Sequence, residues 1–268
     1  MIIIGEKING TIPAVKEAIE KRDAAFIGEL AKKQAEAGAD YIDLCASTAP
    51  EHEIEALRWL VDVAQAATDT PLCLDSPNPR VIEAVFKNVE KPGLINSISE
   101  EGDKCEILLP LLAGNSWEFV GLTCDNTGIP TDLQMKLDIT KSMVEKASQY
   151  GVAPERIHID PCVLAMATDS NSPLNFTAEI KAIKALFPTI HVTGAISNIS
   201  FGLPARALMN KTFMVMAIQA GLDSAVMDPL NREIMGTVFA TNALMGKDRY
   251  CKKYSQAFRQ GRIGQQAK

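Results

Sequence analysis

The alternation of short β-branched runs with amphipathic stretches is the feature that most constrains how this 268-residue chain can fold. The expected strands are Ile2–Gly5, Tyr41–Leu44, Leu72–Asp75, Gly93–Asn96, Glu118–Leu122, Ile157–Asp160, His191–Gly194 and Ser224–Met227. The expected helices are Asp23–Ala37, Ile54–Ala67, Pro79–Asn88, Lys104–Leu112, Asp132–Tyr150, Asn175–Phe187, Leu208–Ala220 and Asn231–Leu244. The strands are continuously apolar, as strands are when helices cover their outer face. Eight strand–helix units in this length therefore predict an α/β fold, a single TIM (β/α)8 barrel.

An open, doubly wound sheet is the competing fold, but its usual dinucleotide fingerprint, G-x-G-x-x-G after the first strand, is absent. We expect one barrel over residues 1–250 and a basic C-terminal tail over residues 251–268. From Lys252 to Lys268 the tail carries five basic residues, no acid and no core-forming pattern at its end. This composition favours a frayed terminus over a docking arm for an acidic partner.

The composition is that of an ordinary enzyme, with 47% apolar and 22% charged residues. A net charge of −6 and a pI near 5.2 argue against nucleic acid, whose phosphates demand a basic face. The first residues turn acidic too soon for a signal peptide, and no apolar run approaches the roughly 18 residues that would span a membrane. We therefore expect a cytoplasmic protein with no nucleic acid and no membrane as partner.

The six cysteines contain no CxxC pair and no other compact metal spacing, which favours unpaired thiols in a reducing compartment. Four of them nevertheless fall near expected strand ends: Cys45, Cys73, Cys124 and Cys162. A zinc site for thiol activation is therefore an open alternative, although a buried cysteine acting as a small hydrophobe is the commoner case and we expect no metal.

Acids and amides stand at the ends of several expected strands. Asp43 and Asp75 follow apolar strand residues, as do Asn96 and Asp160, and Asn198 lies in the segment after the seventh strand. Any one of them would serve as a helix cap, but together they would surround one ligand, because the C-terminal ends of barrel strands share one mouth. Without a matching lysine or arginine, such a set suits a ligand rich in N–H donors, such as a pterin or purine edge, better than a phosphate.

Several motifs, in order and over nearly the whole chain, resemble those of the pterin-binding methyltransferases. The match is to the methyltetrahydrofolate:corrinoid protein methyltransferases, which are related to the folate module of cobalamin-dependent methionine synthase. The motifs that carry the resemblance are Ile4–Gly10, Cys73–Ser76, Ile95–Ser97, Gly121–Thr123, Thr127–Pro130, Ile159–Pro161, Ser197–Ser200 and Asn210–Phe213.

The resemblance implies a TIM barrel, usually a homodimer, that moves a methyl group between N5 of tetrahydrofolate and the cobalt of a corrinoid. Asp75, Asn96 and Asp160 would bond the pterin ring, and Asn198 would lie beside N5. Co(I) is a very strong nucleophile, so the protein must mainly orient the methyl group and stabilise the leaving amine, without a metal of its own. Asn198 would do so by binding the transition state better than the ground state, with Asp75 as the next candidate proton source.

Some residues depart from the family pattern or have two readings. Relatives often have Asp-Leu-Asn where this chain has Asp43-Leu44-Cys45, so that amide contact is lost or replaced by Ser47 or a water. Phe201 would wall the pterin or the cobalamin approach, or simply pack, and Arg206 would contact the folate tail or serve as a cap or ion-pair partner. Glu6 and Asn9, on the loop after the first strand, would contact the ligand or fix the loop.

Three other functions remain open: a dihydropteroate synthase-like enzyme, a zinc-thiol methyltransferase barrel and a non-catalytic folate-binding protein. The first would need a lysine and an arginine for pyrophosphate, a pattern that the sequence lacks. No corrinoid-binding Asp-x-His-x-x-Gly motif is present, so the cobalamin is expected on a separate corrinoid protein. The direction of methyl transfer and the identity of that protein are not fixed by the sequence.

Overall fold

A computed structural model describes residues 1–264 and shows one sheet of eight strands, all paired in parallel. The strands are β1 (Ile2–Asn9), β2 (Tyr41–Cys45), β3 (Leu72–Asp75), β4 (Leu94–Glu100), β5 (Glu118–Asp125), β6 (Ile157–Asp160), β7 (His191–Val192) and β8 (Ser224–Met227). Their order is β7-β6-β5-β4-β3-β2-β1-β8. The two ends of this order meet just past β7, where the Val226 amide donates to the Gly194 carbonyl at 3.1 Å. The sheet thus closes into the predicted barrel.

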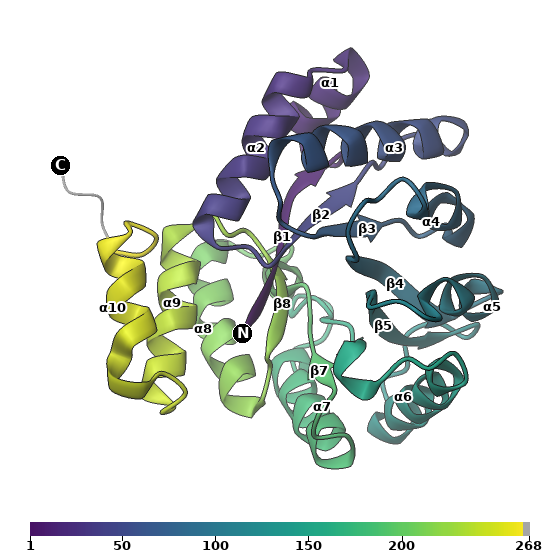
Figure 1. Ribbon diagram of the computed structural model, residues 1–268. Coiled ribbons are helices and arrows are strands. Elements are labelled where there is room, and N and C mark those ends of the chain that lie inside the picture. Colours follow the sequence, from purple (N-terminus) through teal and green to yellow (C-terminus); the bar gives the residue numbers. More distant parts are fainter. Residues whose placement is uncertain (265–268) are drawn as a thin grey trace.

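Helices surround the strands on all sides (Figure 1). The α-helices are α1 (Pro13–Lys21), α2 (Ala24–Ala37), α3 (Pro50–Ala67), α4 (Pro79–Phe86), α5 (Lys104–Leu108), α6 (Leu133–Ser148), α7 (Ser172–Leu186), α8 (Arg206–Ala220), α9 (Arg232–Leu244) and α10 (Lys252–Arg259). Short 3₁₀ turns are η1 (Leu109–Leu112), η2 (Pro154–Arg156), η3 (Ile196–Ser200) and η4 (Arg249–Cys251). None of the helices in the described part of the chain is both long and apolar enough to cross a membrane.

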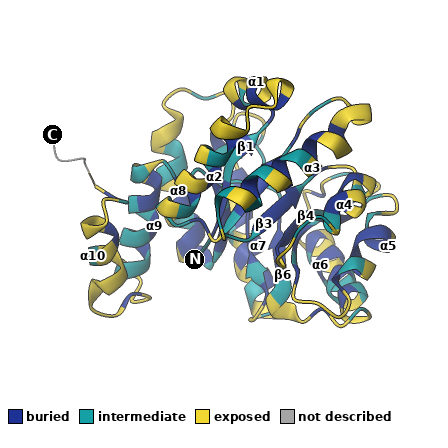
Figure 2. Cartoon of the chain, turned by 45° about the horizontal axis from the view of Figure 1, so that its top comes forward, coloured by how far each residue is buried: buried dark blue, intermediate teal, exposed yellow. Residues whose placement is uncertain are grey.

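The apolar core lies mainly between the strands and the ring of helices, and exposed residues gather on the outer helix faces (Figure 2). A smaller cluster of Ile4, Cys73, Leu94 and Val120, from four different strands, fills the barrel interior. At the opposite end of the strands from the mouth, a buried histidine, His158, lies 2.7 Å from a Glu118 carboxylate oxygen. The barrel interior is therefore a packed core and not a pore.

The C-terminal segment differs from expectation. Residues 252–259 form α10, which packs beside α9, and Ala257 and Ile263 are buried at 0% and 2% exposure. The Arg232 guanidinium, from α9, donates to the carbonyls of Ile263 and Gly264 at 3.1 Å each. The expectation of a frayed end is wrong over residues 252–264, because two apolar side chains are enough to dock this short segment. Residues 265–268, which also belong to the expected tail, lie outside the described residues.

Candidate active site at the barrel mouth

Three of the expected residues, Asp43, Asp75 and Asn96, come together on the neighbouring strands β2, β3 and β4. Asp75 ends β3, whereas β2 continues to Cys45 and β4 continues to Glu100. In the sheet register Cys45 lies beside Asp75, and Asp75 lies beside Asn96. The Asn96 side-chain amide donates to the Asp43 carboxyl at 3.3 Å. The parallel pairing places all three side chains at the C-terminal end of the barrel, as the sequence predicts.

The Asp43 and Asp75 carboxyls form a hydrogen-bonded pair. Burial raises the pKa of Asp43 well above its usual range, and the neighbouring Asp75 raises it further. Burial also raises the pKa of Asp75 to about 6, although hydrogen bonds with the Cys45 thiol and with Asp43 lower it. The pair therefore holds a proton more readily than an isolated carboxyl does, and a carboxylate of the pair can accept N–H groups of a ligand.

Asp160 ends β6 and is held by the loop that follows it. Its carboxylate accepts from the Cys162 backbone amide at 2.7 Å, and burial raises its pKa to about 6. Behind the loop, the buried Lys136 ammonium donates to the Pro161 carbonyl at 2.7 Å and pairs with Glu179 at 2.7 Å. This buried ion pair, which the sequence did not indicate, fixes the position of Asp160 at the mouth.

Asn198 lies in the 3₁₀ turn η3, directly past the short strand β7. Its side chain is exposed and makes no hydrogen bond to any other described residue. The turn is held from outside, because the Arg206 guanidinium donates to the Ser197 carbonyl at 2.9 Å and to the Ser200 hydroxyl at 3.0 Å. Arg206 also lies 5.9 Å from the ring centre of Phe201, which is 68% exposed. Arg206 therefore braces the turn, and it does so without a contact to the Asn198 side chain.

Glu6 and Asn9 lie within β1 and not on a loop after it, because β1 continues to Asn9. The Asn9 side-chain oxygen Oδ1 accepts from the Thr11 backbone amide at 2.9 Å and from the Thr11 hydroxyl at 2.7 Å, so Asn9 fixes the chain that leaves the strand. Burial raises the pKa of Glu6, as does the nearby Asp228, and Glu6 in turn raises the pKa of Asp43. Glu6 therefore adds a third carboxyl side chain to Asp43 and Asp75, on the strand that pairs with β8.

The thiols near the strand ends separate into two groups. The Cys45 thiol lies 3.1 Å from the Ser47 hydroxyl, whereas the Cys124 thiol is hydrogen-bonded to the Cys162 thiol on the other side of the mouth, and both remain free cysteines. Within residues 1–264, no three His, Cys, Asp or Glu side chains come together in an arrangement that would hold a metal ion. The described residues thus provide no ligand set for the zinc-thiol alternative.

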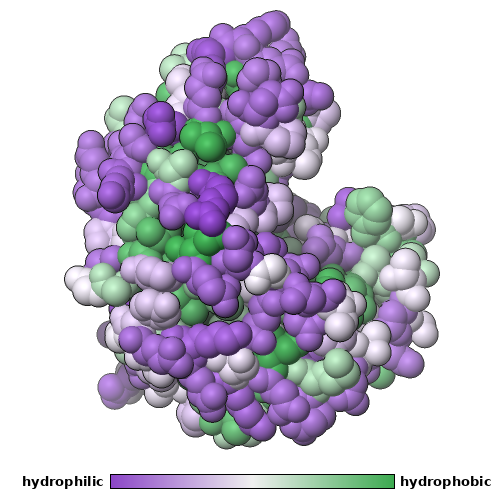
Figure 3. Space-filling view, turned by 90° about the vertical axis from the view of Figure 1, so that its right-hand side faces the viewer, coloured by the Kyte–Doolittle hydropathy of each residue, from purple (hydrophilic) through white to green (hydrophobic). Residues whose placement is uncertain are grey.

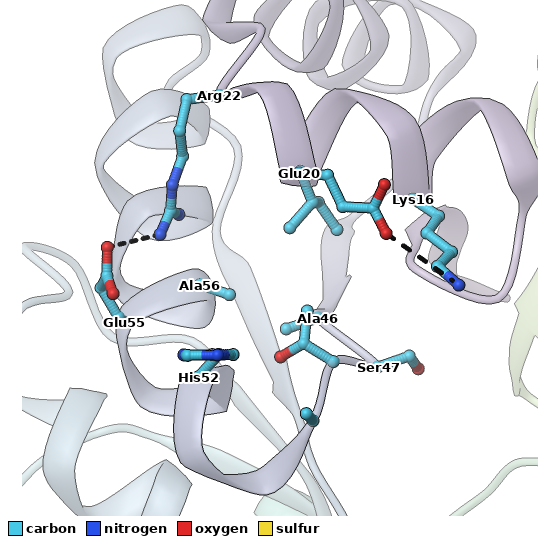
Figure 4. A pocket seen from close by; sticks show the side chains of 11 residues that line it. Lys16, Glu20, Arg22, Ala46, Ser47, His52, Glu55 and Ala56 are labelled. Carbon is cyan, nitrogen blue, oxygen red and sulfur yellow. Dashed lines mark hydrogen bonds and ion pairs between the residues drawn. The ribbon is translucent and has the colours of Figure 1, made fainter.

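A cavity of about 460 Å³ opens beside this cluster, between α1, the loop after β2 and the start of α3 (Figure 4). The sequence prediction missed it because it missed α1. The signals for that helix were present: Pro13 at its first turn and the apolar spacing of Val15, Ala18 and Ile19. A side view of the molecule shows a broad hollow with many hydrophilic side chains around it (Figure 3).

Comparisons with known proteins show which family the chain resembles over most of its length. The model of the family described as pterin binding enzyme matches residues 6–228. The chain is 58% identical over 266 residues, 98% of both proteins, to a protein of Eubacterium limosum named methylcorrinoid:tetrahydrofolate methyltransferase. It is also 28% identical over 250 residues to the methionine synthase of Mycobacterium leprae, of which it spans 21%.

Solved structures with the same fold include two dihydropteroate synthases. That of Xanthomonas albilineans has a TM-score of 0.68 at 19% identity over 92% of both chains. That of Yersinia pestis has a TM-score of 0.68 at 16% identity over 92% of this chain and 93% of the other. At this level of identity the likeness establishes the barrel fold alone.

Proposed function

The chain belongs to the pterin-binding enzyme family, among the methyltransferases that act between tetrahydrofolate and a corrinoid, and we propose how its mouth carries out that reaction. The observation that carries the function is the 58% identity over 98% of the chain to the Eubacterium limosum methyltransferase. The mouth is chemically suited to it, because acids and an amide converge there. By analogy with that relative's name, the methyl group moves from the methylcorrinoid to tetrahydrofolate.

Pterin recognition rests on Asp75, Asn96 and Asp160. A tetrahydropterin presents N–H donors along one edge, and carboxylates accept such donors strongly. The Asn96 amide complements them by offering both a donor and an acceptor. Burial raises the pKa of Asp75 and of Asp160, so their ionised forms are poorly stabilised in the empty site. The N–H donors of a bound ligand stabilise these ionised carboxylates, and this stabilisation contributes to the affinity for the ligand.

Asn198 acts at N5 in this proposal. The lone pair of N5 forms the new bond to the methyl carbon, and the electron pair of the broken cobalt–carbon bond stays on cobalt. Positive charge therefore develops on N5, and the amide oxygen of Asn198 stabilises it, a contribution on the order of 2–4 kcal/mol. The N5 proton must then leave. Asp75, with a pKa of about 6, is the candidate acceptor, directly or through water.

The corrinoid arrives on a separate protein, which would cover the mouth at the exposed Phe201 and the turn that bears Asn198. We also propose a cytoplasmic homodimer, as the family resemblance implies. Exposed apolar side chains on the outer face of α8, Leu208 at 62% and Val215 at 43%, suit a subunit contact. Sedimentation of the purified protein tests the dimer.

Turnover with methylcobalamin and tetrahydrofolate, in buffer containing a chelator, tests the reaction. The spectrum of the cobalamin should change as methyltetrahydrofolate forms. Binding without turnover, with either free methylcobalamin or a methylated corrinoid protein, would favour the non-catalytic alternative, and dependence on added zinc would favour a thiol-activating site.

Calorimetry of folate binding tests the site separately. Asp160→Ala should weaken the binding of tetrahydrofolate by about 1.5–3 kcal/mol, the range for a hydrogen bond to a charged group. An unchanged affinity would remove Asp160 from the site, and no folate binding to the folded wild-type protein would overturn the proposed function.

A further inference from the structure

A second cavity lies at the opposite end of the barrel from the mouth. Its volume is about 320 Å³, and it opens between the start of β1, the turn before β2 and the helices α9 and α10. Figure 1 shows α9 beside the N-terminal end of β1 and α10 beside α9. The strand β1 runs from Ile3 on the cavity wall to Asn9 at the mouth, a rise of roughly 20 Å. The cavity is therefore separate from the proposed folate site.

Three cationic side chains line this cavity. Lys247 follows α9, Lys253 lies in the first turn of α10, and Arg262 comes from the segment that docks after α10. The ion pairs found within residues 1–264 include none of the three. Their positive charges are therefore not matched by a carboxylate of the described chain.

Arg262 is firmly held at the wall. Its guanidinium lies over the ring of Phe239, from α9, at 5.5 Å from the ring centre. On another side it lies against the backbone at Gly38, where a Cβ atom would overlap the Arg262 Nη1. The Arg262 Nε is buried and has no hydrogen-bond partner among the described residues. An unpaired buried donor is costly, so an acceptor bound in the cavity would satisfy it.

The two acids on the wall are engaged elsewhere. The Asp40 carboxylate accepts from the Ile3 amide at 2.8 Å. The Asp248 carboxylate accepts from the backbone amides of Lys253 and Tyr254, at 3.0 Å and 2.9 Å, at the start of α10. Each acid thus holds a backbone N–H and leaves the cationic side chains to a ligand. This cationic lining stands out in a chain whose net charge is −6.

We propose that this cavity binds a small oxyanion with two or more negative charges, such as a phosphate ester or a dicarboxylate. The guanidinium of Arg262 would hold one oxyanion group, because its N–H donors match the oxygen spacing of phosphate and carboxylate groups. The exposed ammonium groups of Lys247 and Lys253 would attract the remaining charge. The volume fits a small molecule. The inference goes beyond the proposed function, because no step of the methyl transfer uses this cavity.

The test measures the binding of two probes, inorganic pyrophosphate and succinate, to the full chain by calorimetry at low ionic strength. The wild-type protein should bind one equivalent of at least one probe: pyrophosphate alone would identify a phosphate ligand, and succinate alone a dicarboxylate. Arg262→Gln should weaken this binding roughly 10- to 100-fold through the loss of charge-assisted hydrogen bonds. Arg259→Gln, which removes the same charge from an exposed position of α10 outside the cavity, is the matched control and should not change the affinity.

A second pair of variants keeps the test decisive if Arg262→Gln loosens the C-terminal segment. Lys253→Gln should weaken binding about 2- to 5-fold, as expected for one exposed charge, and its neighbour Lys252→Gln, outside the cavity, should leave it unchanged. Binding of neither probe to the folded wild-type protein would overturn the inference. Equal weakening by Lys253→Gln and Lys252→Gln would overturn it as well, since only overall charge would then matter. Neither result bears on the methyl transfer, which folate binding and turnover test separately.

Discussion

Asn198→Ala separates catalysis from folding at the mouth. The Asn198 side chain is exposed and makes no hydrogen bond to other described residues, while the turn that bears it is held by Arg206. Removing the amide therefore creates no core cavity and leaves no buried group unpaired. The free energy of unfolding should change by no more than about 0.5 kcal/mol, as at other exposed positions.

Turnover should respond much more strongly than stability. A single preorganised group aimed at developing charge is worth on the order of 10²–10³ in kcat, about 2.7–4 kcal/mol. If Asn198 binds N5 more tightly as the bond to the methyl carbon forms, kcat should fall at least as much as tetrahydrofolate affinity does. Asp75→Ala should instead lose affinity first, because Asp75 meets the pterin in both states.

The measurement has three parts: urea unfolding, calorimetry of tetrahydrofolate binding and single-turnover demethylation of methylcobalamin followed by its spectrum. Asn198→Asp is a useful companion because it keeps the size of the side chain and one acceptor oxygen. The reasoning would be refuted by an alanine variant that is clearly less stable yet turns over normally per folded molecule. That outcome would make Asn198 a structural residue and would move the catalytic role to Asp75.

Three further outcomes follow from the described contacts. Arg206→Ala removes the hydrogen bonds that hold the turn η3. We expect kcat to fall about 10-fold and the free energy of unfolding to fall by only about 0.5–1.5 kcal/mol. Equal kinetics in variant and wild type would exclude a bracing role for Arg206. Asp160 has a pKa raised from 3.8 to about 6, so its stability contribution is complete below pH 3.8 and is lost as pH rises through 6. Asp160→Asn keeps the acceptor for Cys162 without the charge. Unfolding curves of the apoprotein at pH 4 and pH 6.5 should therefore show the variant gaining on the wild type by about 2 kcal/mol, and parallel pH profiles would contradict the shift. Ile263→Asp should lower the free energy of unfolding by about 2–4 kcal/mol in thermal or urea unfolding, because Ile263 is 2% exposed. Gln260→Asp, at an exposed site, is the control and should leave the free energy of unfolding almost unchanged. Equal values for the two variants would mean that the C-terminal segment does not dock.

The barrel could be predicted from the sequence because each strand–helix unit carries its own local signal. The bounds of β3, β6 and β8 agree with the prediction, and Pro79 begins α4 as expected. The strands β1 and β5 end several residues later than predicted, at Asn9 and Asp125. Their last residues include polar side chains, so a search for apolar runs ends each strand too early. The helix α1 was missed although Pro13 at its first turn and the apolar spacing of Val15, Ala18 and Ile19 indicate a helix there.

The position of the expected site residues near one end of the barrel was easier to predict than their contacts. Neighbouring parallel strands run in register, so Asp43, Asp75 and Asn96, which lie on β2, β3 and β4, come together near one end of the barrel. For Arg206 and for Asn9, the sequence allowed either a ligand contact or a structural role. The choice depends on the contact of Arg206 with Ser200 and of Asn9 with Thr11, which no spacing pattern in the sequence specifies. Likewise, the buried ion pair behind Asp160 joins Lys136 and Glu179, which are 43 residues apart in the sequence. No local pattern predicts that these two residues meet in the folded chain.

The charge balance of the mouth explains why this barrel suits a pterin better than a pyrophosphate. Acids outnumber available cations there: the Lys7 ammonium is paired with Asp228 at 3.1 Å, and the Arg206 guanidinium is occupied by its own turn. An incoming pyrophosphate would meet carboxyl groups without a free cation from these two side chains, and its desolvation would go uncompensated. A neutral ring with several N–H donors meets the opposite situation, since each donor it offers relieves a carboxylate that burial has made hard to ionise. The same fold therefore serves different reactions, and the charges at the strand ends select which ligand it accepts.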